Sequence, residues 1–101
     1  MGNKPIEKGR RPVHPGEILR EDVLPALSMT IGQFAQAVGV TRKTMSMLIN
    51  EKQGVSPAMA MRLSRALGNS ARVWTNLQTS YDLWHAEVPI DIEPIAWKDV
   101  A

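Results

Sequence analysis

Polar and basic side chains are concentrated between residues 41 and 52, at spacings that place most of them on one face of a short helix. Arg42 and Lys43 are donors suited to guanine edges or to phosphates, and Met47 offers an apolar contact for a thymine methyl group. Hydroxyl and amide side chains around them can donate to phosphate oxygens. These residue types at this spacing predict a helix that contacts DNA. Its candidate contact residues are Thr41, Arg42, Lys43, Thr44, Ser46, Met47, Asn50 and Lys52.

Two short helices joined by a tight turn would hold these side chains in place. At the start of the first, Thr30 and Gln33 have the spacing of a capping box, in which hydroxyl and amide each satisfy a free backbone group. Gly39 allows the left-handed backbone of a sharp turn, and Thr41 can cap the second helix. The apolar positions expected to face inward are Phe34, Ala35, Val38, Val40, Met45 and Leu48. The pattern predicts a helix-turn-helix whose second helix enters a DNA major groove; an ordinary helical hairpin with a solvated face is the alternative.

The composition fits one small helical domain without thiol chemistry. Of the 101 residues, 44% are hydrophobic and only 5% aromatic, which favours a helical protein over a β-sandwich. There is no cysteine, so disulfides, zinc–thiolate sites and thiol nucleophiles are excluded. The sequence has no Gly-rich phosphate loop and no cluster of metal ligands, so we expect neither an enzyme nor a metal or other cofactor. No apolar run approaches the roughly 20 residues that span a bilayer, which predicts a cytoplasmic protein without membrane contact.

Charge is distributed unevenly around a net value of +2. Residues 1–12 hold four bases against one acid, whereas residues 81–101 hold five acids against one base. The basic start has no periodicity and two prolines, which predicts a disordered arm that follows DNA or only aids solubility. The acidic end suits a basic partner or is ordinary surface charge.

One more helix is predicted before the helix-turn-helix. Pro15 suits a first helical position, and Glu17 and Glu21 favour the positive end of the helix dipole. We expect Pro25 to end this helix, because proline lacks the N–H that continues the hydrogen-bond ladder. Its expected buried face is Ile18, Leu19, Val23 and Leu24. His14 has no cluster of other ligands beside it, so a cap or loop role is expected in place of a metal site.

A further helix is predicted to begin at Ser56 and Pro57, which supply a hydroxyl cap and a first helical position. Gly68 would end it. The apolar residues that recur at helical spacing in between are Met59, Ala60, Leu63, Ala66 and Leu67.

The last helix and the segment after it predict a contact between two copies of the chain. Along this helix an apolar stripe recurs at steps of three and four residues, comprising Trp74, Leu77, Tyr81 and Trp84. Trp74 can anchor the core, but the last two aromatic residues lie beyond the part that short helices could cover. Val88, Ile90 and Ile92 then alternate with polar residues or proline, as in a half-buried strand. Such a strand would pair with its copy across a two-fold axis or lie as a tail on its own domain. The predicted dimer interface is Tyr81, Trp84, Val88, Ile90 and Ile92.

Three stretches resemble a known family, namely HPGEILRE near the start, GVTRKTMSMLIN in the middle and MAMRLSRALGNSARVWTNLQTSYDLW toward the end. They resemble the Xre, or Cro/repressor-like, helix-turn-helix proteins and, within these, HigA-type antitoxins (the HigA/VapI family) of bacterial toxin–antitoxin systems. The resemblance covers residues 13–87. It implies an all-α, five-helix lambda-repressor-like domain. One short C-terminal β-strand paired across a dimer is an addition that rests on the alternating tail alone, which lies outside the resemblance. The expected organisation is a basic arm at 1–12, the DNA-binding domain at 13–87 and a dimerising tail at 88–101.

The resemblance also implies a function. HigA-type antitoxins are dimers that neutralise a ribosome-dependent mRNA endonuclease of the RelE/HigB type and repress their own operon at an inverted-repeat operator. The residues that match the base-reading positions of the family are Arg42, Lys43 and Met47. Relatives often carry a polar, phosphate-binding residue where this chain has Ile31 and Gly32, which leaves Gln33 as the expected contact there. A stand-alone Xre-family repressor without a toxin partner is the alternative, and the flanking genes would discriminate between the two.

Overall fold

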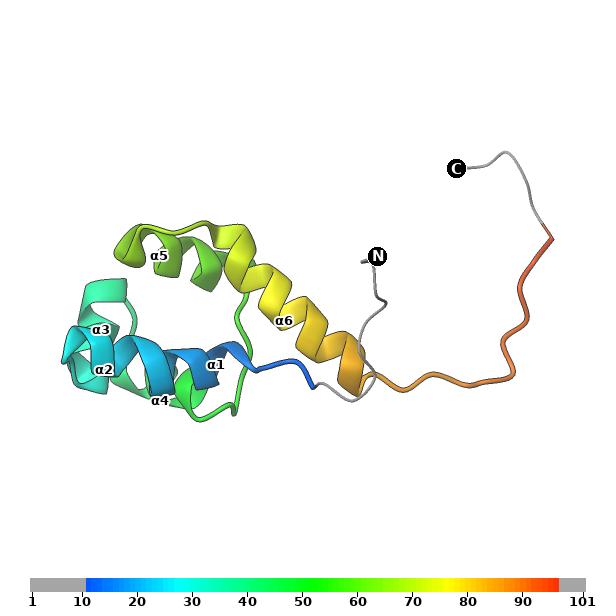
Figure 1. Cartoon of the computed structure of the whole chain (residues 1–101), viewed down its shortest axis with the longest axis horizontal. Coiled ribbons are helices and arrows are strands. Elements are labelled where there is room, and N and C mark those ends of the chain that lie inside the picture. Colours follow the sequence, from blue (N-terminus) through cyan, green and yellow to red (C-terminus); the bar gives the residue numbers. More distant parts are fainter. Residues whose placement is uncertain (1–10, 97–101) are drawn as a thin grey trace, which may run out of the picture.

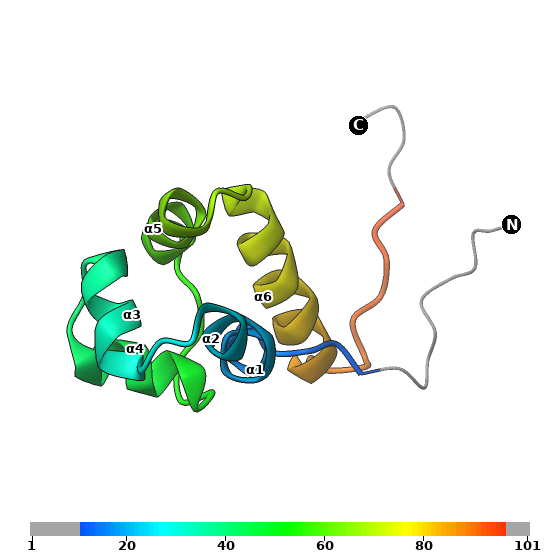
Figure 2. The same cartoon turned by 60° about the vertical axis from the view of Figure 1, so that its left-hand side comes forward.

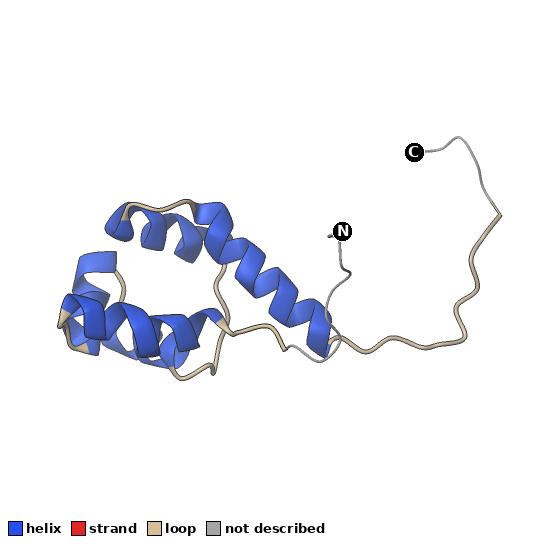
Figure 3. Cartoon of the chain, in the orientation of Figure 1, coloured by secondary structure: helices blue, strands red, loops and turns tan. Residues whose placement is uncertain are grey.

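The computed structural model describes residues 11–96, and the regular structure of this part is helical (Figures 1 and 3). The first helix has three consecutive parts, α1 (Pro15–Ile18), the π-helical turn η1 (Leu19–Val23) and α2 (Leu24–Leu27). It is followed by α3 (Ile31–Val38), α4 (Arg42–Ile49), α5 (Pro57–Leu67) and α6 (Ala71–His85). The predicted all-α architecture of five helices is therefore confirmed. Most of the predicted basic arm and the last five residues of the tail lie outside the described residues.

The helix starts carry the caps that the sequence predicts. The Thr30 hydroxyl accepts from the Gln33 N–H at 3.1 Å, and the Gln33 side-chain oxygen accepts from the Thr30 N–H at 2.9 Å, which completes the capping box. The α3 helix ends at Gly39, whose φ of 87° is left-handed, as the turn requires. The hydroxyl groups that cap α4, α5 and α6 belong to Thr41, Ser56 and Ser70.

The sequence predicts that the first helix ends at Pro25. In the structure this helix instead continues through Pro25 to Leu27. Just before the proline the ladder changes, because the Leu24 N–H donates to the carbonyl of Leu19, five residues back, in place of four. This π-helical turn gives the proline ring more room beside the preceding turn, where an α-helical carbonyl would clash with it. Ser28 ends the helix, with a left-handed φ of 55°.

The core lies between α3, α4 and α5, and the first helix and α6 close it. The inward-facing residues predicted for the helix-turn-helix are buried, apart from half-buried Val40. Trp74 is 2% exposed and anchors α6 as predicted, while its indole N–H donates to the Asn69 side-chain oxygen at 3.1 Å. Ala66, expected on the apolar face of α5, is instead exposed. The buried apolar residues are Leu19, Phe34, Ala35, Val38, Met45, Leu48, Ile49, Val55, Met59, Ala60, Leu63 and Trp74.

The segment after α6 forms no strand within the described residues. Residues 86–96 are irregular, with a turn at residues 90–91, and leave the helical body (Figures 1 and 2). The side chains of Val88, Ile90 and Ile92 are 70%, 99% and 68% exposed. The strand is therefore not formed in the single chain, where it has no neighbouring ladder to pair with. The alternative of a tail packed on its own domain is also wrong for these residues. Pairing across a two-fold axis stays a prediction.

The start of the first helix is buried against α4 and α6. His14 is 4% exposed, and its Nδ1 accepts the Gly16 N–H at 2.8 Å, which gives it the expected capping role. The imidazole lies edge-on to Tyr81 of α6, with ring centroids 4.7 Å apart. At Gly16 the first helix touches α4 so closely that a Cβ would overlap the Leu48 carbonyl oxygen. The sequence HPGE thus fits a helix start into a narrow space.

Gly16→Ala is expected to destabilise the fold by about 1–3 kcal/mol, because the added methyl group would overlap backbone that cannot move aside. Urea unfolding followed by circular dichroism would show a lower midpoint with an unchanged slope. Gly32→Ala is the matched control, since a Cβ there would meet only the flexible Arg42 side chain, at 3.7 Å. Equal midpoints for the two variants would contradict the role given to Gly16.

The buried imidazole is expected to make stability depend on pH. Burial lowers the pKa of His14 from its ordinary value of 6.5, while Glu51 and Asp82 act in the opposite direction without reversing the shift. Because the unfolded state takes up the proton first, the stabilisation is complete above about pH 6.5 and is lost as the pH falls below it.

Urea midpoints at about pH 7.5 and pH 5 measure this loss. His14→Asn keeps a capping acceptor without a titrating ring, so its midpoint should fall less than that of the wild type. An equal fall in both proteins would exclude His14 as the source.

Candidate nucleic-acid interface

The α4 helix has a buried side and an exposed side. Met45, Leu48 and Ile49 face the core. The predicted contact residues lie away from it, because Thr41, Arg42, Lys43, Met47, Asn50 and Lys52 are exposed and Thr44 and Ser46 are half-buried. Figures 1 and 2 both place α3 at the end of the molecule far from the tail, with α4 beside it. The structure therefore brings the predicted residues around α4 to the surface as a group.

Thr41 and Thr44 form a small hydrogen-bonded unit at the start of α4. The Thr41 hydroxyl accepts the Thr44 N–H at 3.1 Å and lies 3.0 Å from the Thr44 hydroxyl oxygen, to which it can donate. Its donor and one of its acceptor sites are then used within the chain. The hydroxyl proton of Thr44 is left to donate outward. Of the two predicted contacts, Thr44 is the better placed to bind a phosphate, and Thr41 mainly sets the helix start.

At the start of α3, Gln33 and Arg42 provide donors close to the turn between the helices. The Gln33 side-chain oxygen is engaged in the capping box, which orients its NH₂ group away from that bond. Arg42 extends from α4 across the first turn of α3, where a Cβ on Gly32 would lie 3.7 Å from its Cδ and 3.9 Å from its Nε. The absence of a side chain at Gly32 thus makes room for Arg42.

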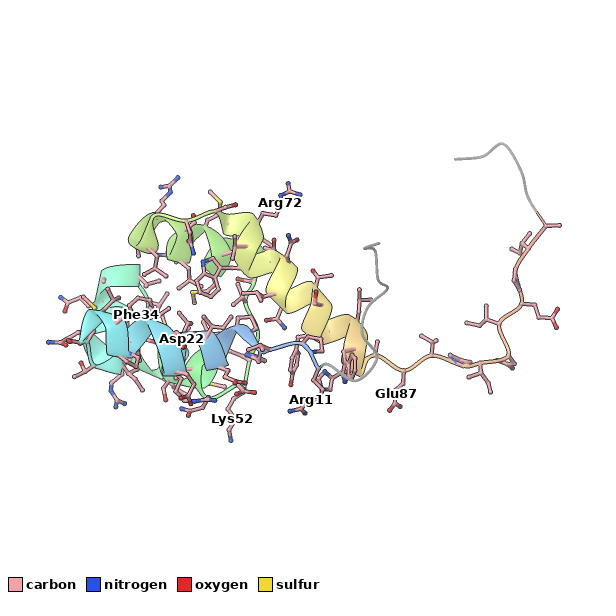
Figure 4. All side chains as sticks on the ribbon, in the orientation of Figure 1. Arg11, Asp22, Phe34, Lys52, Arg72 and Glu87 are labelled. Carbon is pink, nitrogen blue, oxygen red and sulfur yellow. The ribbon has the colours of Figure 1, made fainter. Side chains whose placement is uncertain are left out.

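At the other end of α4, Asn50 is fastened to the preceding turn. Its side-chain NH₂ donates to the Ser46 carbonyl at 2.8 Å and approaches the Ser46 hydroxyl at 3.3 Å. The Asn50 side chain is therefore partly used by the chain itself, and Lys52, just beyond the helix, points away from the body (Figure 4).

The cations of this surface have no carboxylate partner within residues 11–96. Both ion pairs in that part of the chain belong to Arg20, which lies 3.0 Å from Glu21 and 3.1 Å from Glu51. Glu51 is the acid nearest in sequence to the contact residues, and it is paired with Arg20, which it shares with Glu21. The positive charges of Arg42, Lys43 and Lys52 are therefore open to a polyanion.

Two arginines that the sequence does not single out hold this surface in place. Arg20 donates to the Ile49 carbonyl at 2.7 Å and so binds the end of α4 to the first helix. Arg62 on α5 donates to the carbonyls of Val38 and Gly39 at 3.2 and 3.1 Å, and these bonds hold the turn between α3 and α4 against α5. Such long-range bonds leave no periodic signal in the sequence, although both residues fall within the stretches that carry the family resemblance.

Other kinds of site find little support in the described part of the chain. Residues 11–96 contain no group of three or more histidine or acidic side chains placed to hold a metal ion. No helix among them is long and apolar enough to cross a membrane.

Comparisons with known proteins cover most of the chain. A helix-turn-helix family matches residues 19–74. Virulence-associated protein I of Dichelobacter nodosus is 38% identical over 84 residues, which are 82% of this chain and 78% of that protein. Antitoxin HigA-1 of Vibrio cholerae is 43% identical over 75 residues, covering 74% of this chain and 70% of that one. The solved structure of the Pseudomonas aeruginosa antitoxin HigA with the higBA promoter is similar at 40% identity and a TM-score of 0.71, covering 73% and 80% of the two chains.

These matches confirm the resemblance and the fold class expected from the sequence. They include the helix-turn-helix itself, because the family match extends from the first helix to Trp74. The chain belongs to the helix-turn-helix family of DNA-binding regulators, within its HigA-type antitoxin group.

Proposed function

We propose that this chain binds an inverted-repeat operator as a homodimer, represses its own operon and neutralises an mRNA endonuclease toxin of the RelE/HigB type. The observation that supports DNA binding most is the exposed side of α4, where cations that have no carboxylate partner among residues 11–96 lie beside hydroxyl and amide donors. The similarity to a HigA antitoxin whose structure includes a promoter supports the same conclusion.

In the proposed complex, two copies of α4 enter successive major grooves, with half-sites about one helical turn, roughly 34–36 Å, apart. Arg42 and Lys43 donate to the O6 and N7 atoms of guanine, and exposed Met47 contacts a thymine methyl group. Arg42 passes over the first turn of α3, where the missing side chain of Gly32 leaves it room.

Phosphate contacts then fix the position of the protein on the duplex. The donors best placed for them are the Gln33 NH₂ group, the Thr44 hydroxyl, the Ser46 hydroxyl and Lys52. The NH₂ group of Asn50 is engaged with Ser46 and would have to be shared with a phosphate. Thr41 acts mainly through the helix start that it caps. The N-terminal end of α4 adds its own favourable field toward phosphate.

The proposed toxin is a basic nuclease, so the acidic surfaces of the chain are the candidates for binding it. The first helix exposes Glu17, Glu21 and Asp22, and the tail exposes Glu87, Asp91 and Glu93. A stand-alone repressor is the second candidate, because several of the similar proteins are described as transcriptional regulators.

Arg42→Ala is expected to weaken binding to the DNA upstream of the gene by about 1–3 kcal/mol and to relax specificity at one base position. Lys52→Ala should weaken binding to all sequences alike and reduce the salt slope by about 1. Arg72→Ala is the control, since this exposed arginine points away on the side of the molecule opposite to Lys52 in Figure 4. Fluorescence anisotropy titrations at several salt concentrations measure all three. Wild-type affinity and specificity in Arg42→Ala would exclude it as a base-reading residue.

Co-expression with the adjacent reading frame tests the antitoxin role. A small basic protein from that frame should co-purify with this chain, and its inhibition of translation in vitro should be relieved when the two are mixed. The Lys52→Ala variant should relieve the inhibition of translation as well as the wild type does, because Lys52 is assigned to DNA contact and not to toxin binding. Failure of the neighbour to bind, or the absence of such a frame, would favour the stand-alone repressor.

A further inference from the structure

An apolar groove separates the first helix from α6 and is not part of the DNA-contacting surface. Its larger hollow, of about 620 Å³, is lined mainly by Val13, Ile18, Leu77, Leu83 and Trp84. A second hollow of about 390 Å³ shares Ile18 and Leu77 and continues the groove toward α2. Leu83 is 71% exposed and Trp84 39%, so the single chain leaves a continuous apolar surface uncovered.

The tail of the chain has the composition that such a groove would take. Within the described part of the tail, up to residue 96, the large apolar side chains are all strongly exposed, and they are Val88, Ile90, Ile92 and Ile95. Acidic residues alternate with them, namely Glu87, Asp91 and Glu93. Arg11 lines the groove, near the end of α6 from which Glu87 follows (Figure 4). The larger hollow therefore matches the tail in apolar surface and, at Arg11, in charge, whereas the second hollow matches it in apolar surface but carries the acid Asp22.

The tail of the same chain is poorly placed to fill this groove. Leu83 and Trp84, which line it, lie only a few residues before the tail, so the chain would have to reverse at once. Instead Ala86 is extended, with ψ of 145°, and Pro89 restricts the residue before it to extended conformations. The turn comes only at residues 90–91. By then the chain has moved away at about 3.3 Å per residue, as Figures 1 and 2 show.

We propose that the groove binds residues 88–95 of a second copy of this chain, and that the two copies exchange tails around a two-fold axis. Because a two-fold axis makes the two groove–tail contacts equivalent, both grooves are filled and neither apolar tail remains exposed. This deepens the proposed function, since it rests on the dimer and assigns its interface. Trp84 and the tail residues belong to this interface, whereas Tyr81 is held by His14 within its own chain.

Cysteine cross-linking tests the exchange directly, because the native chain has no cysteine. Full-length Leu83→Cys and Ile90→Cys proteins are mixed, treated with a short bismaleimide and analysed by denaturing gel and mass spectrometry. A cross-link between Cys at position 83 of one chain and position 90 of the other is expected. Met61→Cys mixed with Ile90→Cys is the matched control, since Met61 is 49% exposed on α5, away from the groove. It should give little product.

Four results would overturn the proposal. They are a dominant product from Ile90→Cys alone, which indicates tail-to-tail pairing; an intramolecular product in a variant that carries both Leu83→Cys and Ile90→Cys, which indicates docking in the same chain; equal product with the Met61→Cys control; and no product at all, as expected if the groove serves a different partner.

A second measurement is independent of cross-linking. Ile90→Ser, at a fully exposed position that cannot disturb the monomer, should raise the dimer dissociation constant by about tenfold or more in sedimentation equilibrium. Met61→Ser should leave it unchanged, and an unchanged constant in Ile90→Ser would also overturn the proposal. If the wild-type dimer binds operator but the cross-link between positions 83 and 90 of the variants does not form, the tail exchange is refuted and the proposed function is not. A cross-linked dimer that binds no DNA would refute the proposed function alone.

Discussion

The contact between the first helix and the last turn of α4 is the constraint on which the rest of the structure depends. Gly16 lies against the Leu48 carbonyl, and Arg20 binds the carbonyl of Ile49 at 2.7 Å. Carbonyls at a helix end have no partner within the helix. Arg20 satisfies the carbonyl of Ile49 and the Glu51 N–H satisfies that of Leu48, while the close contact at Gly16 fixes the direction of α4. At the opposite end Arg62 holds the turn. The helix that presents Arg42 and its neighbours is thus held at both ends by residues of other helices.

Local features of this fold follow from the sequence, because their causes lie within a few residues. Thr30 and Gln33 form the predicted capping box, and Gly39 has the left-handed backbone that the turn requires. The buried faces of α3 and α4 also follow from helical spacing. The same spacing identified which side chains around α4 are exposed, and so most of the candidate site.

Features that depend on distant residues were not predictable in this way. Proline normally ends a helix, yet Pro25 is accommodated by a π-helical turn that no local pattern indicated. Tyr81 lies against His14, 67 positions earlier in the chain, a contact that helical spacing does not reveal, and its place in a dimer interface stays a prediction. The apolar tail was predicted as a strand because alternation alone does not say whether a partner is present. For Tyr81 and the tail, the missing information is which segments meet in space; for Pro25 it is a change of hydrogen-bond register within the first helix itself.

The missing side chain at Gly32 has a consequence for how such proteins diverge. Arg42 crosses this position, so any larger residue there would begin within 3.7 Å of its Cδ and restrict its conformations. Two related chains with identical recognition helices could then present the same arginine differently. Evolution of operator preference can therefore proceed through a neighbouring residue on α3, while every residue of the recognition helix stays the same.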